Sequence, residues 1–92
     1  MKRHDLKTWP AFFEHIWRGA KRFELRKNDR DFHTGDELLL REWEPDPEKY
    51  TGRYVRVHVT YVLRGPILGL AEGWVVMSIA QFERGTQAIG KC

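Results

Sequence analysis

Residues Gly19 to Arg26 read G-A-K-R-F-E-L-R and contain the side chains of this chain that are best suited to chemistry. The pattern is typical of a strand, in which alternate side chains point to opposite faces. Phe23 and Leu25 would then share a buried face, with Lys21 at the entry turn. The other face would carry Arg22, Glu24 and Arg26. Such a strand could form the floor of a polar cleft, or a solvated outer face whose charges pair with one another.

One early helix followed by strands is the predicted order of elements. Thr8 is a candidate N-cap, Pro10 is acceptable in a first turn, and Gly19 suits a left-handed C-terminal position, so we expect a helix over Thr8–Arg18. Strands are expected at residues 22–27 and 37–43, from Tyr50 onward, and at residues 73–82. The predicted buried residues include Phe12, Ile16, Phe23, Leu25, Leu38, Leu40, Val57, Val59 and Val76.

The clearest alternation runs through the middle of the chain. Val55, Val57, Val59 and Tyr61 would face one way, whereas polar residues between them would face the other. This pattern is typical of a half-buried strand in an antiparallel sheet. We therefore predict an α+β fold, in which a small, mostly antiparallel and strongly curved sheet closes into a barrel and the N-terminal helix packs against it.

Length and composition predict one domain. The chain has 92 residues, 41% of them hydrophobic, and we assign residues 1–83 to the domain and residues 84–92 to a flexible tail. No apolar run is long enough to span a membrane. The single cysteine, Cys92, rules out a disulfide within the chain and favours a reducing cytoplasm.

Charge is distributed unevenly along the chain. Up to Thr34 there are nine Lys and Arg against five Asp and Glu, which gives +4, and the remainder has seven against eight, which gives −1. The segment Asp36–Glu48 alone holds six acidic residues and one Arg. A basic N-terminal third suits an anionic ligand, and its modest excess suits a short single strand or a nucleotide better than a long duplex.

Several standard chemistries are not indicated by the sequence. It contains no glycine-rich phosphate loop of the P-loop or dinucleotide type and no G-x-S-x-G elbow. The histidines at positions 4, 15, 33 and 58 lack the i, i+4 spacing that a helical zinc site prefers, so we expect neither a metal nor a cofactor. His4 lies just before the expected helix, where it is either an exposed imidazole or part of a site near the helix N-terminus.

Three segments together resemble a known family. They are H-D-L-K-T-W-P at residues 4–10, G-A-K-R-F-E-L-R at residues 19–26, and K-N-D-R-D-F-H-T-G-D at residues 27–36. The chain is similar to the small bacterial and phage ASCH domains of the PUA-like superfamily. Their signature G-x-K-x-x-E-x-R is met at Gly19, Lys21, Glu24 and Arg26. The residues G-W-V-V-M-S-I at 73–79 resemble the final strand of that family.

The resemblance implies a PUA-like barrel of five or six strands, with a cleft between barrel and helix that recognises RNA or a modified nucleoside or nucleotide. It places Lys21, Glu24 and Arg26 in that cleft, and we expect His4, Lys7 and Trp74 to contribute to ligand binding there. Arg and Lys can hold a phosphate or a base carbonyl, and Glu can accept from a base amino group. Either Trp9 or Trp74 could stack a base, although a core position is the more usual one for a Trp.

Two other functions remain open at this point. Some ASCH relatives are amidohydrolases that act on a modified cytidine with a Lys, a Thr nucleophile and a Glu. Here the Thr position is Glu24, so Lys21 and Glu24 would be the catalytic pair only if a different hydrolysis, or a ribonuclease activity, applies. The other alternative is a protein-binding adaptor that uses the acidic segment Asp36–Glu48.

Overall fold

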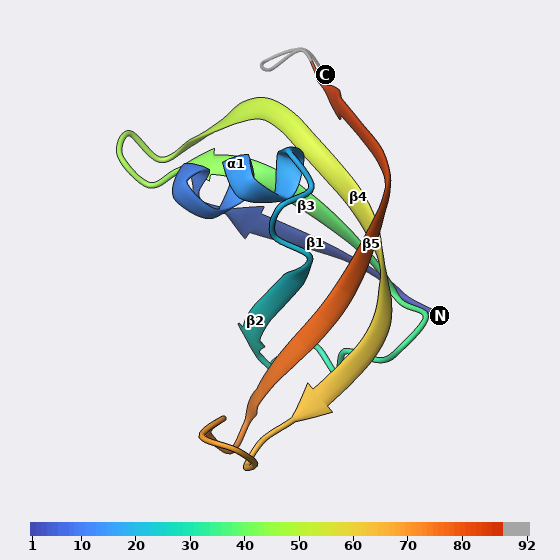
Figure 1. Ribbon diagram of the computed structural model, residues 1–92. Coiled ribbons are helices and arrows are strands. Elements are labelled where there is room, and N and C mark those ends of the chain that lie inside the picture. Colours follow the sequence, from blue (N-terminus) through green and yellow to red (C-terminus); the bar gives the residue numbers. More distant parts are fainter. Residues whose placement is uncertain (88–92) are drawn as a thin grey trace.

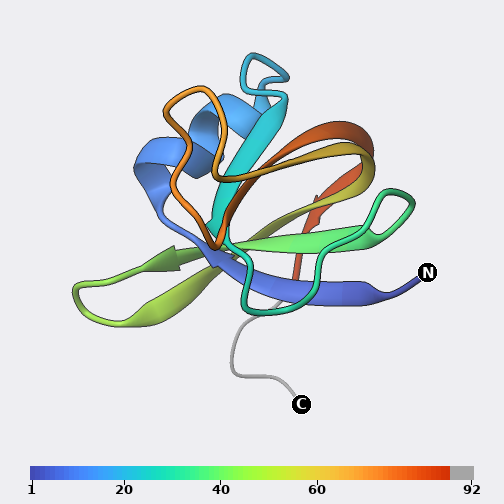
Figure 2. The same cartoon turned by 90° about the horizontal axis from the view of Figure 1, so that it is seen from below.

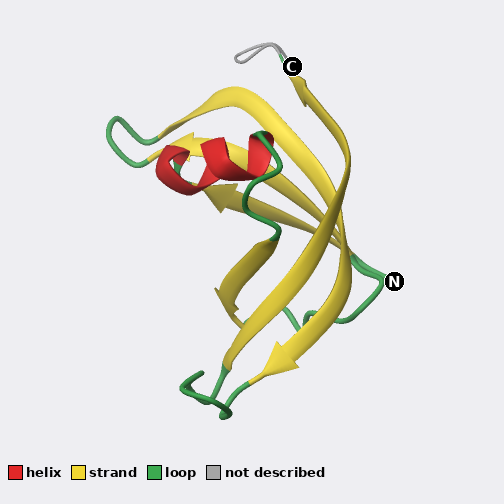
Figure 3. Cartoon of the chain, viewed as in Figure 1, coloured by secondary structure: helices red, strands yellow, loops and turns green. Residues whose placement is uncertain are grey.

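One five-stranded sheet and one helix make up the computed structural model, which describes residues 1–87 (Figures 1 and 3). The elements are β1 (Arg3–Thr8), α1 (Pro10–Trp17), β2 (Phe23–Lys27), β3 (Glu37–Glu44), β4 (Lys49–Arg64) and β5 (Trp74–Thr86). The strand order is β1-β3-β4-β5-β2, with β1 parallel to β3 and every other pair antiparallel. The sheet curls into a half-barrel (Figures 1 and 2). The prediction of a small, curved and mostly antiparallel sheet with one helix is confirmed, whereas the predicted closure into a barrel is corrected, because β1 and β2 do not pair within the described residues and remain the two edges of the sheet.

The core lies inside the curl of the sheet. Val55, Val57 and Val59 of β4 are buried as predicted, and so are Leu38 and Leu40 of β3. These two strands pair with Leu38 opposite Val57 and Leu40 opposite Val55, so their inward side chains stack in register. None of the helical segments in residues 1–87 has the length and apolarity needed to cross a bilayer.

A bulge in β4 corrects the predicted facing of Tyr61. The register with β5 shifts between Val59 and Tyr61. One extra residue turns the following side chains to the other face of the strand. Tyr61 therefore points outward into solvent, and Val62 packs against the core in its place.

Strand β1 was not predicted from the sequence. His4, Leu6 and Thr8 alternate inward with exposed Arg3, Asp5 and Lys7, and the strand runs parallel to β3. Thr8 is thus the last residue of a strand and not the N-cap of the helix. That position belongs to Trp9, which makes no side-chain capping hydrogen bond.

The buried stripe of α1 is narrower than predicted. Phe13 and Ile16 enter the core, whereas Phe12 is exposed, which corrects its assignment to the interior. A helix turns about 100° per residue, so in a helix this short only one i, i+3 pair faces the sheet squarely. Phe12 therefore points to the side of the helix, toward β2, where it lines a cleft.

A cluster around Arg53 joins α1 to the sheet. Its guanidinium donates to both oxygens of the buried Glu42 at 2.9 and 3.0 Å and to Glu14 of the helix at 3.1 Å. The hydrogen bond from Arg53 lowers the pKa of Glu42 against the opposing effect of burial. The same guanidinium lies 5.2 Å from the ring centre of Phe13 and 4.9 Å from that of Trp17. One side chain therefore fixes the helix against β3 and β4.

Strands β2 and β5 face opposite to the prediction. Phe23 and Leu25 are exposed and Glu24 is buried, while Val75 and Met77 are buried and Val76 is only half-buried. Met77 lies directly opposite Glu24 in the antiparallel pair, so both point inward together.

The predicted tail is also corrected, because β5 continues through Thr86 and pairs with β4 there. The remainder of that tail, residues 88–92, lies outside the described residues.

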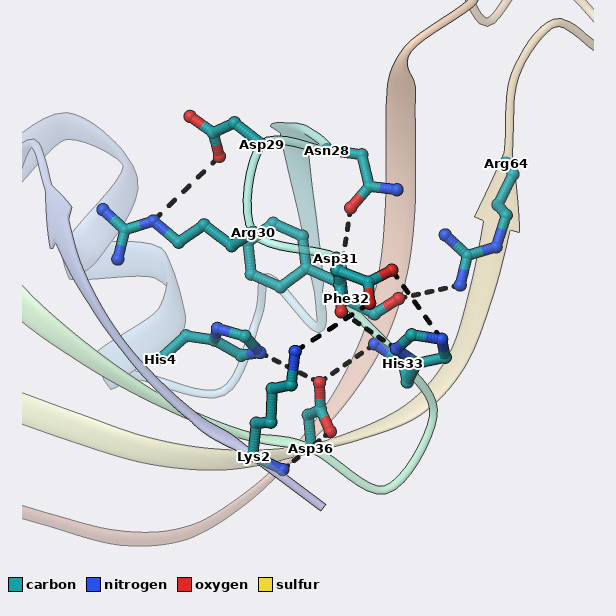
Figure 4. A network of polar contacts seen from close by, with 10 residues as sticks. All are labelled: Lys2, His4, Asn28, Asp29, Arg30, Asp31, Phe32, His33, Asp36 and Arg64. Carbon is teal, nitrogen blue, oxygen red and sulfur yellow. Dashed lines mark hydrogen bonds and ion pairs between the residues drawn. The ribbon is translucent and has the colours of Figure 1, made fainter.

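The turn before β3 is held by the carboxylate of Asp36 (Figure 4). Its oxygens accept from the ring Nε2–H of His4 at 2.9 Å and from the backbone N–H groups of Lys2 and His33, each at 3.0 Å. The backbone of Asp36 also pairs with Val59 of β4. Asp36 therefore joins the start of β3 to β1 through its buried carboxylate and to β4 through its backbone.

This network predicts a pH dependence of stability. Burial raises the pKa of Asp36, but the hydrogen bonds from His4, Lys2 and His33 together bring it down from 3.8 to about 2. Because the folded pKa lies below the unfolded one, the stabilisation is complete above about pH 4 and is lost as the pH falls through about 2. We expect the free energy of unfolding to drop by about 2 kcal/mol more for the parent than for Asp36→Asn between pH 4 and 2. Chemical denaturation at each pH measures this, and identical pH profiles would contradict it.

Candidate functional site

The carboxylate of Glu24 lies inside the half-barrel, where its residue is 3% exposed, between two cations. Lys21 Nζ donates to Oε1 at 2.7 Å and Arg26 Nε donates to Oε2 at 2.8 Å. A buried carboxylate is tolerated only when such charge-assisted hydrogen bonds replace its lost hydration. The prediction that Lys21 is the cation nearest to Glu24 is confirmed, with Arg26 almost as close.

The turn after α1 brings Lys21 back onto β2. Gly19 has a φ of +81°, the left-handed conformation expected of a residue that follows a helix. The backbone N–H of Lys21 then donates to the carbonyl of His15 in the last turn of the helix. The ammonium group also donates to the carbonyl of Phe23 at 2.7 Å, so it closes over the start of the strand.

Arg26 bridges the two edges of the sheet. Strands β1 and β2 are its ends, and they approach each other across the opening of the half-barrel. Arg26 Nη2 donates to the carbonyl of Lys7 at 3.0 Å and to Thr8 Oγ1 at 3.3 Å. Arg30, which follows β2, donates to the carbonyl of Asp5 at 3.1 Å, and Asp5 lies two residues before Lys7 in β1. Guanidinium groups thus occupy the backbone acceptors along this edge of β1.

A cleft of about 550 Å³ lies at this junction of β1, α1 and β2. This volume falls within the usual range of small-molecule sites. Three aromatic side chains line it while still exposed: Trp9 at 52%, Phe12 at 53% and Phe23 at 48%. The other lining residues are Lys7, Thr8, Lys21, Glu24, Leu25 and Arg26. The site thus combines aromatic faces with cations and one buried carboxylate.

Four of the residues predicted for the site meet in this cleft, and two do not. Lys7, Lys21, Glu24 and Arg26 line it together. His4 lies outside it, buried against Asp36 and 4.7 Å from the ring centre of Phe32 (Figure 4), so its expected place in the cleft is corrected. Alternation along β1 sends the His4 side chain into the core.

Trp74 also lies outside the cleft. It is directly opposite Lys27 in the β2–β5 pair, on the outer face of the sheet. The cleft residues that sequence reasoning missed are Phe12, Phe23 and Leu25, which the apolar pattern assigned to the core. Alternation in β2 places Phe23 and Leu25 on the face opposite Glu24, but it does not show which of the two faces is inside.

The donors of the cleft are only partly used within the protein. The ammonium of Lys21 has three N–H donors and uses two, on Glu24 and Phe23. Arg26 donates through Nε and Nη2, and its Nη1 has no hydrogen-bond partner among residues 1–87. An incoming carbonyl or phosphate oxygen therefore has donors available without breaking the contacts that hold Glu24. Within the same residues no three His, Cys, Asp or Glu side chains gather as a metal site.

Half of the acidic side chains of Asp36–Glu48 are engaged inside the fold. Asp36 holds His4, Glu42 holds Arg53, and Glu37 accepts from Arg56 at 2.7 Å. The hydrogen bond from Arg56 lowers the pKa of Glu37. The acidic surface is accordingly smaller than the sequence suggests.

Comparison with known proteins identifies two relationships. A protein-family model described as a domain of unknown function (DUF3850) matches residues 3–79, which include all the strands except the end of β5. A protein of Escherichia phage P2, described as an uncharacterized 12.9 kDa protein in the GpA 3′ region, is 39% identical over 61 residues. The match covers 66% of this chain and 54% of the phage protein, so the chain matches about half the length of that relative.

The geometry around Glu24 predicts that its charge supports the fold. In Glu24→Gln the two flanking cations lose their counter-charge, and the amide presents one donor where an acceptor is needed. We expect the free energy of unfolding to fall by about 1–3 kcal/mol, measured by urea denaturation at pH 7. The matched control is Glu72→Gln on the exposed surface, which we expect to change stability by less than about 0.5 kcal/mol. Equal stability of both variants would show that the buried ion pair contributes nothing.

Proposed function

This chain belongs to the DUF3850 family, and we propose that it binds single-stranded RNA or a modified nucleotide in the cleft between α1, β1 and β2. The observation that carries the proposal is that exposed aromatic rings lie next to a buried ion pair in one cleft. Trp9, Phe12 and Phe23 stay about half exposed around a carboxylate that two cations hold in place. Stacking surfaces beside fixed donors and an acceptor are the chemistry that recognises an unpaired base.

Each group in the cleft has a role suited to such a ligand. Trp9 and Phe23 offer faces on which a base can stack. The remaining N–H donors of Lys21 and Arg26 can reach a phosphate or a base carbonyl. The carboxylate of Glu24 can accept from a base amino or ring N–H group, and its two cations keep it oriented for that contact.

The resemblance to ASCH domains supports the same proposal. The residues of the signature, Gly19, Lys21, Glu24 and Arg26, are those that build the turn and the buried ion pair of the cleft. The half-barrel with an early helix is compatible with a PUA-like fold, and on this basis we propose that the chain is related to the PUA-like superfamily. In this proposal the signature serves first to fix Glu24 and then to present donors beside it.

Binding is favoured over hydrolysis by the state of Glu24. A general base needs a carboxylate oxygen that can take a proton from water. Here both oxygens already accept from cations at 2.7 and 2.8 Å. Both oxygens are thus engaged, so the carboxylate serves better as a fixed hydrogen-bond acceptor than as a proton carrier. The adaptor alternative is weakened because Asp36, Glu37 and Glu42 are engaged within the fold.

The proposal predicts tighter binding of short single-stranded RNA than of duplex DNA, with affinity that falls as salt rises. A ligand that places about two to four phosphates near the cations should give a log–log salt slope of roughly −1.5 to −3. Replacing Trp9 or Phe23 by Ala should weaken binding about 5- to 150-fold, because each base stacked on an aromatic ring contributes about 1–3 kcal/mol. Fluorescence anisotropy with labelled tetranucleotides measures both effects.

The matched control is Phe82→Ala, which removes an exposed aromatic ring of β5 that stacks on His58 outside the cleft. We expect it to leave RNA affinity unchanged. Duplex binding that is tight and insensitive to salt, or equal binding by the Trp9, Phe23 and Phe82 variants, would contradict the proposed function.

A further inference from the structure

The outer face of the β2–β5–β4 ladder is apolar, although it faces solvent. The register places Phe23, Ser78 and Tyr61 in one row across the three strands, and Leu25, Val76 and Leu63 in the next. In a third row Lys27 lies opposite Trp74. Directly paired residues point to the same face of a sheet, so these eight side chains form one surface, which we call the outer platform.

Exposure on the outer platform is high for such large side chains. Tyr61 is 61% exposed, Leu25 51% and Trp74 40%. Contiguous apolar surface of this kind on a small domain marks an interaction site. The bulge in β4 contributes directly, because it is what turns Tyr61 out of the core and onto this face.

Two features of the outer platform indicate its occupant. Its only charged member is Lys27, and none of its eight residues carries a carboxylate, so the surface suits an anionic partner. It is also continuous with the candidate cleft, because Phe23 and Leu25 belong to both. Aromatic rings on an open sheet beside a cation are a recurrent arrangement for stacking the bases of a single strand.

We propose that the outer platform extends the cleft into a path for single-stranded nucleic acid, with Tyr61 and Trp74 stacking the bases that follow the one held in the cleft. This inference rests on the proposed function. The backbone of Tyr61 lies two strands from that of Phe23, which at the usual strand spacing is about 10 Å. The backbone of Trp74 lies four residues along β5 from Ser78, the residue opposite Phe23, which is about 13 Å along the strand. Neither Tyr61 nor Trp74 lines the cleft, so we expect only a ligand of several nucleotides to use them.

The test compares a nucleoside monophosphate with a tetranucleotide of the same base. We expect the tetranucleotide to bind at least about fivefold more tightly to the parent chain, since stacking each further base adds affinity. Tyr61→Ala and Trp74→Ala should each lose about fivefold or more for the tetranucleotide and leave the monophosphate unchanged. Tyr61→Phe should keep tetranucleotide affinity because the ring remains. Melting temperatures and the Phe82→Ala control show whether a loss is local.

The outcomes separate this inference from the proposed function. If the monophosphate binds in the cleft but length, Tyr61 and Trp74 make no difference, the outer platform is not part of the path and the proposed function stands. If no nucleotide of any length binds, both fail. Sedimentation of the parent chain without ligand provides the remaining check: a dimer that Tyr61→Ala dissociates would show that the outer platform docks a second copy, and would overturn the inference.

Discussion

The ion pair of Glu24 with Lys21 and Arg26 sits where the sheet fails to close, and the exposed chemistry of this domain depends on it. Burying a carboxylate without partners costs several kcal/mol, so the two cations are a condition for the inward orientation of Glu24. Once Glu24 points inward, strand geometry forces Phe23 and Leu25 outward. The cleft and the outer platform therefore both follow from the orientation of one acidic side chain.

A buried carboxylate held by hydrogen bonds is also found at two other points of the fold. Glu42 is held by Arg53 at the junction of α1 with β3 and β4, and Asp36 is held by His4 and two backbone donors at the start of β3. All buried side-chain polar atoms among residues 1–87 have a hydrogen-bond partner. A chain of 92 residues can bury only a small apolar core. Fully hydrogen-bonded ionic contacts at the edges of that core therefore help to fix how the helix and strands are placed. They also keep the acids from repelling an anionic ligand as strongly as their number implies.

The sequence predicts well wherever one strand has a consistent apolar face. Alternation at Val55, Val57 and Val59 identified the central strand, and the residue types of the 19–26 segment pointed to the residues of the candidate cleft. Alternation alone shows which residues share a face, but not which face is inside. In β2 the usual rule of apolar inside failed for Phe23 and Leu25, because the decision depends on Lys21 from a turn and on acceptors of β1.

Strand β1 escaped prediction because its inward residues His4, Leu6 and Thr8 are mostly polar. Its parallel partner β3 lies more than thirty residues away in the sequence, so no hairpin signal marks it. The facing of Tyr61 was predicted wrongly because the bulge in β4 does not show in the regular alternation of the sequence. In each case the missing information is a long-range pairing, and local pattern does not carry it.

The proposed function requires that ligands bind in the cleft around Glu24. Its most direct test is a titration of the ¹⁵N-labelled intact chain with a short single-stranded RNA, followed by NMR. We expect the indole N–H signal of Trp9 and the backbone amide signals of residues 21–26 to shift first and to saturate together. Shifts confined to the acidic hairpin at residues 44–49, or no shift at RNA concentrations in large excess over the protein, would contradict it.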